Sequence, residues 1–239
     1  MVKTDPVSGP GETGTRAPAN NLTLRIASAV VMAPLALLAA YLGGWPFALF
    51  WAAAAVAVLW EWTALVKGPL WIVAGIGYAG IMLAAPVILR ADAELGLLAI
   101  LLLFAIVWTT DILGYFAGRA FGGPKLWPAI SPKKTWSGAI AGTLGATIIA
   151  VAVAHLFGAF NGGTIAAVEL LLSVVAQLGD LLESWIKRKF GAKDASHLIP
   201  GHGGVMDRLD GFWAAAFLGC LIGVLRGGFE GAARGLLIW

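Results

Sequence analysis

The chain has 239 residues, of which 59% are hydrophobic and only 12% are charged, and its mean hydropathy is +0.86. A water-soluble domain carries roughly twice that charged fraction, so the composition excludes an ordinary soluble globule and indicates a protein folded in a lipid bilayer. The formal net charge of +3 is too small to indicate nucleic-acid binding. A single cysteine, Cys220, excludes a disulfide within the chain.

Residues 1–21 are polar and rich in Pro, Gly and Thr, without the apolar core of a signal peptide. We predict a disordered cytosolic tail over 1–21, followed by one transmembrane catalytic domain over 22–239. Seven stretches of that domain approach the roughly 20 apolar residues that a spanning helix needs. They are Leu22–Leu42, Trp45–Val66, Leu70–Leu89, Leu95–Leu113, Gly138–Phe160, Thr164–Leu182 and Gly211–Leu225. The expected fold class is therefore all-α, a polytopic transmembrane helix bundle with about seven spanning helices and a range of about six to nine.

Two polar segments, Arg119–Ser137 and Glu183–Asp210, interrupt the apolar pattern. Seven spans with the N-terminus inside place both segments on one side of the membrane, together with thirteen of the sixteen Lys and Arg residues. Because positively charged loops face the cytosol, we predict that both segments line a polar cavity open to the cytosol. The bases on the other side are Arg90, Arg226 and Arg234. The C-terminal tail Phe229–Trp239 is too short to span and is expected to lie in the membrane interface.

Charged residues are concentrated around the second polar segment, where residues 180–210 hold five of the thirteen acids and five of the sixteen bases. Asp180, Ser184 and Lys187 are spaced at i, i+4 and i+7, so they share one face of a helix. The run Pro200–Gly204 cannot continue a helix and is predicted to form a compact glycine loop.

Carboxylates at two helix ends, joined by this loop, suit a hard cation. Asp207 and Asp210 lie at i and i+3 at the start of the last spanning helix. With Asp180, they are costly at the ends of apolar helices unless a cation or bases hold them. Mg²⁺ prefers oxygen ligands and usually binds one or two carboxylates plus substrate phosphates, so we predict a Mg²⁺ site at these three acids. Lys187 and Arg208 are expected to face phosphate oxygens, since catalysis of phosphoryl-type transfer is mostly positioning and charge neutralisation.

Simpler explanations fit some members of this set. Glu183 and Lys187 suit an ordinary i, i+4 surface pair as well as a direct role. The run Lys187–Lys189 is typical of a positively charged anchor at the cytosolic surface. His202, in a glycine loop, is more often a turn residue than a catalyst. None of these explanations applies to the three aspartates.

One helical stripe, with members at i, i+4, i+7 and i+8, leads into the first polar segment: Asp111, Tyr115, Gly118 and Arg119. The Pro-, Gly- and Lys-rich run Phe121–Gly138 that follows is predicted to be a loop before a new apolar helix. Taken alone, this segment is better explained as a cytosolic loop with basic anchors.

Phosphate binding is the functional alternative for that loop. Ser131, Thr135 and backbone N–H groups near the start of the new helix are suited to hold phosphate. Lys133 and Lys134 add positive charge. We adopt this interpretation only because of a resemblance that both segments share.

The two segments resemble the signature of the phosphatidate cytidylyltransferases. The matching blocks are Ser184-x-x-Lys187-Arg188-x-x-x-x-Lys193-Asp194 with Pro200-Gly-His202-Gly-Gly-x-x-Asp207-Arg208-x-Asp210, and Asp111-x-x-x-Tyr115-x-x-Gly118-Arg119 with Ser131-Pro-Lys133-Lys134-Thr135. The chain departs from the family at Gly114, Ser137 and Ala195, where Ala, an acid and Ser are common. The resemblance implies a multi-pass enzyme of phospholipid synthesis in the bacterial inner membrane, with Mg²⁺, CTP, phosphatidic acid and membrane lipids as partners. It also implies a homodimer.

By the same resemblance, Asp180, Asp207 and Asp210 are the metal-binding acids, and Lys187 and Arg208 are expected to act beside them. The implied substrate-binding set is larger: Asp111, Tyr115, Arg119, Ser131, Lys133, Lys134, Thr135, Ser184, Arg188, Lys193, Asp194, His202, Gly203 and Gly204. The sequence neither requires nor excludes a second, monovalent cation such as K⁺.

The expected reaction is transfer of CMP from CTP to phosphatidic acid, giving CDP-diacylglycerol and pyrophosphate. One alternative is a CTP-dependent lipid kinase or a cytidylyltransferase for another lipid phosphate. The other is an anion transporter, for which paired inverted repeats with helices broken at mid-membrane would be typical. No such repeat is evident.

Several remaining patterns are explained by packing or by the membrane surface. Glycines at 75, 77 and 80 fit a dinucleotide-binding pattern but lie in an apolar stretch, so we interpret them as helix-packing residues. The same interpretation covers the GxxxG pairs Gly114/Gly118, Gly138/Gly142 and Gly219/Gly223. Glu61 and Glu169 are membrane acids without evident partners, and Glu61 is expected to extend its carboxylate to the cytosolic surface.

Overall fold

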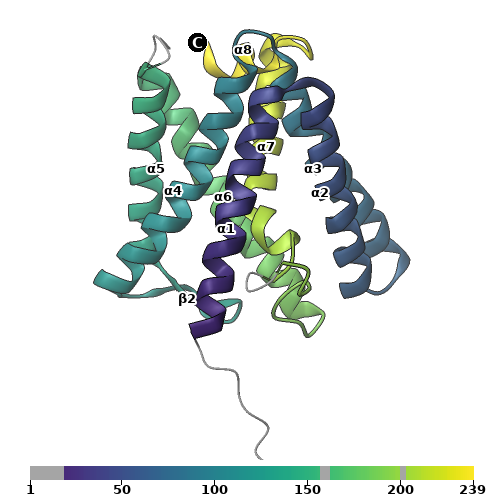
Figure 1. The fold of residues 1–239 in the computed structure, drawn as a ribbon. Coiled ribbons are helices and arrows are strands. Elements are labelled where there is room, and N and C mark those ends of the chain that lie inside the picture. The colour runs from purple at the N-terminus through teal and green to yellow at the C-terminus, as the bar shows by residue number, and fades with distance from the viewer. Residues whose placement is uncertain (1–18, 157–161, 200–202) are drawn as a thin grey trace, which may run out of the picture.

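The computed structural model describes residues 19–156, 162–199 and 203–239 of the chain (Figure 1). Those residues form a helix bundle with one small hairpin of strands. The elements are α1 Ala19–Leu42, α2 Gly44–Leu65, α3 Pro69–Ala91, α4 Gly96–Phe121, β1 Lys125–Trp127, β2 Ser131–Thr135, α5 Trp136–Leu156, α6 Gly162–Lys189, α7 Met206–Gly227 and α8 Ala232–Leu237. The predicted all-α polytopic bundle is confirmed.

Within the described ranges, the six helices from α2 to α7 are long and apolar enough to cross a membrane, and α1 has a shorter apolar part, Ile26–Leu42. Each of the seven predicted stretches overlaps one helix of the series α1 to α7, and residues 157–160 of the fifth stretch lie outside the described residues. Helix α1 begins at Ala19, so its first residues belong to the predicted tail; residues 1–18 lie outside the described residues.

Two helices run further than their apolar stretches predict. Helix α4 continues from the predicted end at Leu113 to Phe121, and α6 continues from Leu182 to Lys189. Helix α4 stops at Gly122, which has a positive φ of 61° and donates its N–H to the carbonyl of Gly118. The polar side chains near both ends are therefore carried on rigid helix.

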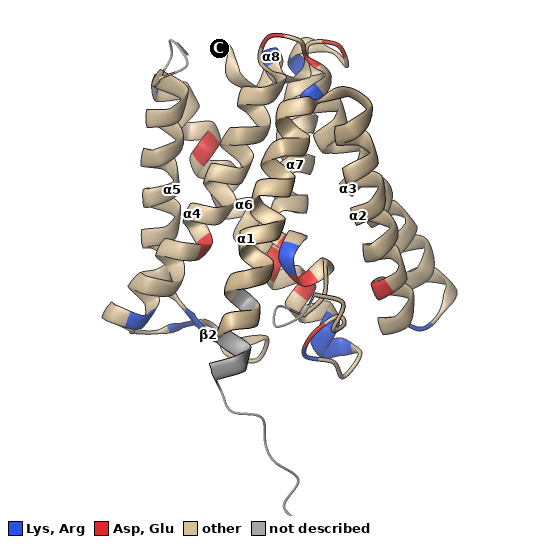
Figure 2. Ribbon diagram, viewed as in Figure 1, with Lys and Arg blue, Asp and Glu red and all other residues tan. Residues whose placement is uncertain are grey.

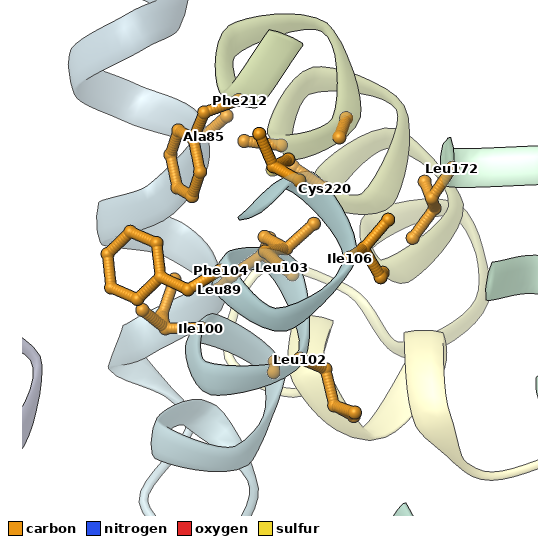
Figure 3. Packing of buried hydrophobic residues seen from close by; sticks show 14 of the residues in the cluster. Ala85, Leu89, Ile100, Leu102, Leu103, Phe104, Ile106, Leu172, Phe212 and Cys220 are labelled. Atoms are coloured by element: carbon orange, nitrogen blue, oxygen red, sulfur yellow. The ribbon is translucent and has the colours of Figure 1, made fainter. Parts of the chain in front are cut away.

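Buried side chains of α4 form the centre of the apolar core (Figure 3). Ile100, Leu103 and Ile106 are at most 1% exposed. Next to them, the ring of Phe212 on α7 stacks on Trp51 of α2, with centroids 4.8 Å apart and planes 12° from parallel. This packing fixes α7 against α2 as well as α4.

Helices α4 and α5 approach each other through glycines. A Cβ atom at Gly138 would lie 2.5 Å from the carbonyl oxygen of Gly114, and one at Gly142 would lie 2.6 Å from that of Thr110. No side chain fits at such distances, so the packing interpretation of these GxxxG pairs is confirmed. Gly75 likewise faces the Trp62 ring of α2, 2.2 Å from where a Cβ would lie.

The run Phe121–Gly138, predicted as a loop, contains the antiparallel hairpin β1–β2, with Lys125 opposite Thr135 and Trp127 opposite Ser131. Positive φ angles of 61° at Gly122 and 94° at Gly123 turn the chain out of α4 into the hairpin. At the other end, the Thr135 hydroxyl accepts the N–H of Gly138 at 3.2 Å and so caps α5. The hairpin is thereby held between two helices.

Charged residues gather mainly at the end of the bundle that carries the hairpin (Figure 2). We call this the cavity end and the opposite one the α8 end. The three Lys and Arg residues predicted to lie on the opposite side of the membrane from the other thirteen lie at the α8 end. Arg90 donates there to Ala40 O at 2.7 Å, and Arg226 donates to Ile238 O at 3.0 Å. Arg234 pairs there with Glu94 at 2.5 Å.

Candidate active site

A cavity of about 400 Å³ opens between α4, α5, α6 and the hairpin at the cavity end. Its lining residues are Thr110, Asp111, Gly114, Tyr115, Gly118, Arg119, Lys125, Leu126, Lys133, Lys134, Thr135, Gly138, Ala139 and Gln177. All four members of the predicted helical stripe are among them, so the side-by-side placement of that stripe is confirmed. Ser131, predicted with them, does not line the cavity.

The cavity is strongly basic. Among its lining residues, Arg119, Lys125, Lys133 and Lys134 face a single acid, Asp111. Tyr115 adds an aromatic ring that is 61% exposed. Such a surface attracts a polyanion and offers a ring on which a base can stack.

An ion pair joins this cavity to the second polar segment. The ammonium of Lys134 in β2 contacts Asp180 Oδ2 on α6. On the same helix, the Ser184 hydroxyl lies 3.4 Å from Asp180 Oδ1 and donates a hydrogen bond to it. The predicted helical face that carries Asp180 and Ser184 is therefore confirmed, and its first acid lies next to the basic cavity.

Acids from three helices are close enough to interact electrostatically. Asp210 on α7 interacts electrostatically with Asp180 on α6 and with Asp111 on α4. Glu183 on α6 is close enough to interact with Asp210 as well. The exposed guanidinium of Arg208 interacts with Asp111. Two of the three predicted metal acids are thus brought together, with Asp111 as an additional neighbour.

Asp207 is used differently. Its Oδ1 accepts a hydrogen bond from Lys187 Nζ at 2.5 Å, and its Oδ2 accepts the N–H groups of Gly204 at 2.8 Å and Ala195 at 3.0 Å. Lys187 also forms an ion pair with Glu183 at 3.0 Å, and these two side chains are only 9% and 1% exposed. The i, i+4 pair is therefore real, but it is buried and not a surface pair.

No three acidic, histidine or cysteine side chains converge on one ion position in the part of the chain that the structure describes. Asp180, Asp207 and Asp210 thus do not form a ready-made cage. Their chemistry still fits Mg²⁺, which needs only one or two carboxylates when substrate phosphates supply further oxygens. Asp180 and Asp210, next to the basic cavity, are the better placed of the three, and the metal site stays a prediction.

The glycine loop closes through its own backbone, because Ile199 and Gly203 exchange two hydrogen bonds of 2.8 and 3.2 Å. Gly203 has a φ of 89°, and a Cβ there would lie 2.9 Å from Asp207 Oδ2. Gly203 is thus explained by close packing of its backbone against a carboxylate. His202, with Pro200 and Gly201, lies outside the described residues.

The remaining predicted substrate residues lie at the end of α6 and in the chain that follows it. Arg188 donates to the carbonyl of Ala192 at 2.9 Å and is exposed, as are Lys193 and Asp194. They do not line the cavity. A role for these three in binding substrate stays a prediction.

Sequence reasoning missed three residues. Lys125 and Gln177 line the cavity, but neither belongs to a helical spacing pattern that would have predicted this. Glu61, expected to reach the membrane surface, is instead fully buried and accepts hydrogen bonds from the start of α7. The expectation failed because a partner more than one hundred residues away leaves no local signal.

The chain matches the sequence model of the Cytidylyltransferase family over residues 67–224. It belongs to this family. The phosphatidate cytidylyltransferase of Brucella abortus biovar 1 (strain 9-941) is 40% identical over 86% of this chain and 94% of its own length. Proteins of the same name from Rickettsia typhi and Haemophilus influenzae are 36% and 44% identical, over 80% and 52% of this chain and 86% and 45% of their own lengths.

The region matched to the cytidylyltransferases contains every residue that lines the cavity and all the acids around Asp180. The resemblance predicted from the two polar segments is therefore confirmed at the level of the family. Glu61 precedes the matched region.

Proposed function

We propose that this membrane enzyme is a phosphatidate cytidylyltransferase, which transfers CMP from CTP to phosphatidic acid and releases pyrophosphate. The observation that carries the proposal is the juxtaposition of a basic cavity and an acidic cluster. The bases are those of α4 and the hairpin, and the acids are Asp111, Asp180 and Asp210. The names of the relatives supply the substrates.

The cavity bases are suited to hold the triphosphate of CTP. Arg119, Lys125 and Lys133 surround a space of about 400 Å³, and their charge offsets the repulsion between two anionic substrates. The exposed ring of Tyr115 lies on the same wall and offers a stacking surface for the cytosine. Lys134 reaches from this group to Asp180, so it links nucleotide binding to the acids.

The reaction then needs positioning more than proton transfer. An oxygen of the phosphatidate phosphate attacks the α-phosphorus of CTP, a new P–O bond forms, and the bond from the α-phosphorus to the bridging oxygen breaks. Pyrophosphate leaves with that electron pair. The attacking phosphate is already ionised near neutral pH, so none of the buried acids is required as a general base.

Asp180 and Asp210 are the residues best placed to hold Mg²⁺, and Asp207 is the third acid of the predicted set. A bound Mg²⁺ would offset charge on the phosphate oxygens that these acids would otherwise repel. Lys187 keeps Asp207 and Glu183 together by its two short contacts. It therefore helps fix the acidic side of the site, in addition to the phosphate contact predicted for it.

We propose further that the cavity end faces the cytosol. In the sequence, thirteen of the sixteen bases lie in segments assigned to that side. CTP would reach the cavity from water, and the lipid headgroup would reach it sideways from the same leaflet. A homodimer and a second monovalent cation such as K⁺ remain predictions, to be checked by mass measurement of the detergent-solubilised protein and by cation substitution in the assay.

The test is product analysis with purified protein in lipid nanodiscs, with CTP labelled either in the α-phosphate or in the γ-phosphate. We expect α-label in the lipid, γ-label in pyrophosphate, and no turnover when Mg²⁺ is chelated. Label from the γ-phosphate in the lipid would instead identify a lipid kinase. Omitting phosphatidic acid and supplying another lipid phosphate is the control for substrate class.

A further inference from the structure

Glu61, near the end of α2, is a buried carboxylate with three donors. Its Oε1 accepts the Ser196 hydroxyl at 2.6 Å and the Val205 N–H at 2.8 Å, and its Oε2 accepts the Met206 N–H at 2.7 Å. The side chain is 0% exposed. Ser196 precedes the glycine loop, and Val205 and Met206 follow it at the start of α7, so all three donors lie at least 135 residues away along the chain.

These contacts replace a cap that α7 lacks. The first N–H groups of a helix have no partner within it, and the Val205 side chain at the N-cap makes no capping hydrogen bond. A carboxylate at that position satisfies the N–H groups and complements the helix dipole. At Gly204, a Cβ would lie 2.8 Å from both Glu61 oxygens, so only glycine allows the carboxylate to come this close.

The same backbone also holds Asp207. Three successive backbone N–H groups donate to carboxylates here. The N–H of Gly204 donates to Asp207, and those of Val205 and Met206 donate to Glu61. Asp207 in turn contacts Lys187, and Asp210 lies one turn further along α7. The start of α7, and with it the position of both acids, is therefore clamped between two carboxylates.

We infer that Glu61 is a positioning residue for cytidylyl transfer, which acts through the backbone of Gly204–Met206 to place Asp207 and Asp210. The inference rests on the proposed function for its kinetic part. It adds a residue of α2, outside the region matched to the family, that does not line the cavity.

Glu61→Gln is the sharpest variant, because it keeps the size of the side chain but offers one acceptor oxygen in place of two. In either orientation its NH₂ group faces at least one of the donors that Glu61 binds. We expect kcat to fall about 10- to 100-fold, the usual cost of losing a residue that orients a ligand. The KM for CTP should stay close to the wild-type value, because the bases that line the cavity do not depend on Glu61. Glu61→Asp, which retains both oxygens, should recover part of the lost kcat.

A second measurement does not depend on catalysis. Hydrogen exchange of the full-length protein in nanodiscs should show faster exchange at the Val205 and Met206 amides in Glu61→Gln than in the wild type. The matched control is Glu169→Gln, which neutralises another buried acid, 1% exposed, on α6. We expect it to leave kcat and the exchange of these two amides unchanged.

If Glu61→Gln fails to fold, Ser196→Ala decides the question, since it removes one donor without altering α2. It should lower kcat by a few fold and speed exchange at Val205. Wild-type kcat and wild-type exchange in whichever variant folds would overturn the inference. A wild-type protein whose Val205 and Met206 amides exchange more slowly than in Glu61→Gln, yet which transfers no cytidylyl group, would instead refute the proposed function. The hydrogen bonds of Glu61 to the start of α7 would still be supported.

Discussion

The two ends of the bundle use charge in opposite ways (Figure 2). At the α8 end, two of the three bases donate to backbone carbonyls and the third, Arg234, pairs with Glu94. Arg90 holds the end of α1, and Arg226 holds the carbonyls of Gly235 and Ile238 with its guanidinium 3.5 Å from the Trp239 ring centroid. At the cavity end, four bases surround open space and three acids lie together. Charge that is already paired stabilises a fold, whereas grouped like charges need a ligand to balance them.

We therefore expect substitutions at the two ends of the bundle to affect different properties, stability at one and turnover at the other. Substitutions at the α8 end should lower the free energy of unfolding without changing turnover per folded molecule. Substitutions of the grouped charges around the cavity should lower turnover with little effect on the free energy of unfolding, because relieving repulsion among like charges costs little stability.

The largest effect is expected for Asp180→Asn. The amide cannot hold a cation as a carboxylate does, and it loses the ion pair with Lys134. We expect kcat to fall by about 10²- to 10³-fold, the scale seen when one transition-state contact is removed, with little change in thermal stability. Glu94→Gln, at an exposed acid of the α8 end, is the matched control and should keep wild-type turnover.

Next in size is Lys134→Ala. Loss of this ammonium removes one positive charge from the cavity and frees Asp180. A fall of about 10- to 100-fold in kcat/KM is expected, with KM for CTP raised, in contrast to Glu61→Gln. Steady-state kinetics at varied CTP would show this, and an unchanged KM would remove Lys134 from nucleotide binding.

At the α8 end, Arg226→Ala should destabilise the protein by about 1–3 kcal/mol, because two carbonyls lose a charged donor. Turnover per folded molecule should not change. Thermal unfolding in detergent measures the first quantity. Arg234→Gln is the control: its side-chain pair with Glu94 is 54% and 73% exposed and should contribute no more than about 0.5 kcal/mol.

The smallest effect is a pH dependence at Asp92, which lies between α3 and α4. Burial alone would raise the pKa of its carboxyl, but N–H donors from Leu95, Arg234 and Glu94 hold the pKa below its ordinary value. The folded state thus favours the carboxylate. Its stabilisation is present above the unfolded pKa of about 3.9 and is lost as pH falls through the lower folded pKa. Unfolding curves measured from pH 6 downward should show that the free energy of unfolding falls more steeply with decreasing pH for the wild type than for Asp92→Asn.

Much of this arrangement could be predicted from local sequence patterns. Apolar length gave the spanning helices, and helical spacing placed Asp111, Tyr115 and Arg119 on one wall of the cavity. These predictions succeed because hydropathy and the 3.6-residue period act over short distances.

Three features lay beyond such reasoning, each for a physical reason. The hairpin β1–β2 depends on pairing between strands of three and five residues, too short to show a period. The acids were expected to converge as one set, but Asp207 is taken by Lys187 and two backbone N–H groups, which spacing does not reveal. Glu61 finds its partners across the bundle, where only folding brings them together.

The central claim is that the grouped charges around the cavity carry out the chemistry and that the paired charges of the α8 end support the fold. The most direct test measures cytidylyl transfer to phosphatidic acid and thermal unfolding in parallel for Asp180→Asn and Arg226→Ala, purified into the same nanodiscs. We predict that Asp180→Asn keeps its unfolding temperature and loses transfer, while Arg226→Ala unfolds earlier and keeps full transfer per folded molecule. Equal loss of transfer in both variants, or transfer retained by Asp180→Asn, would contradict the account.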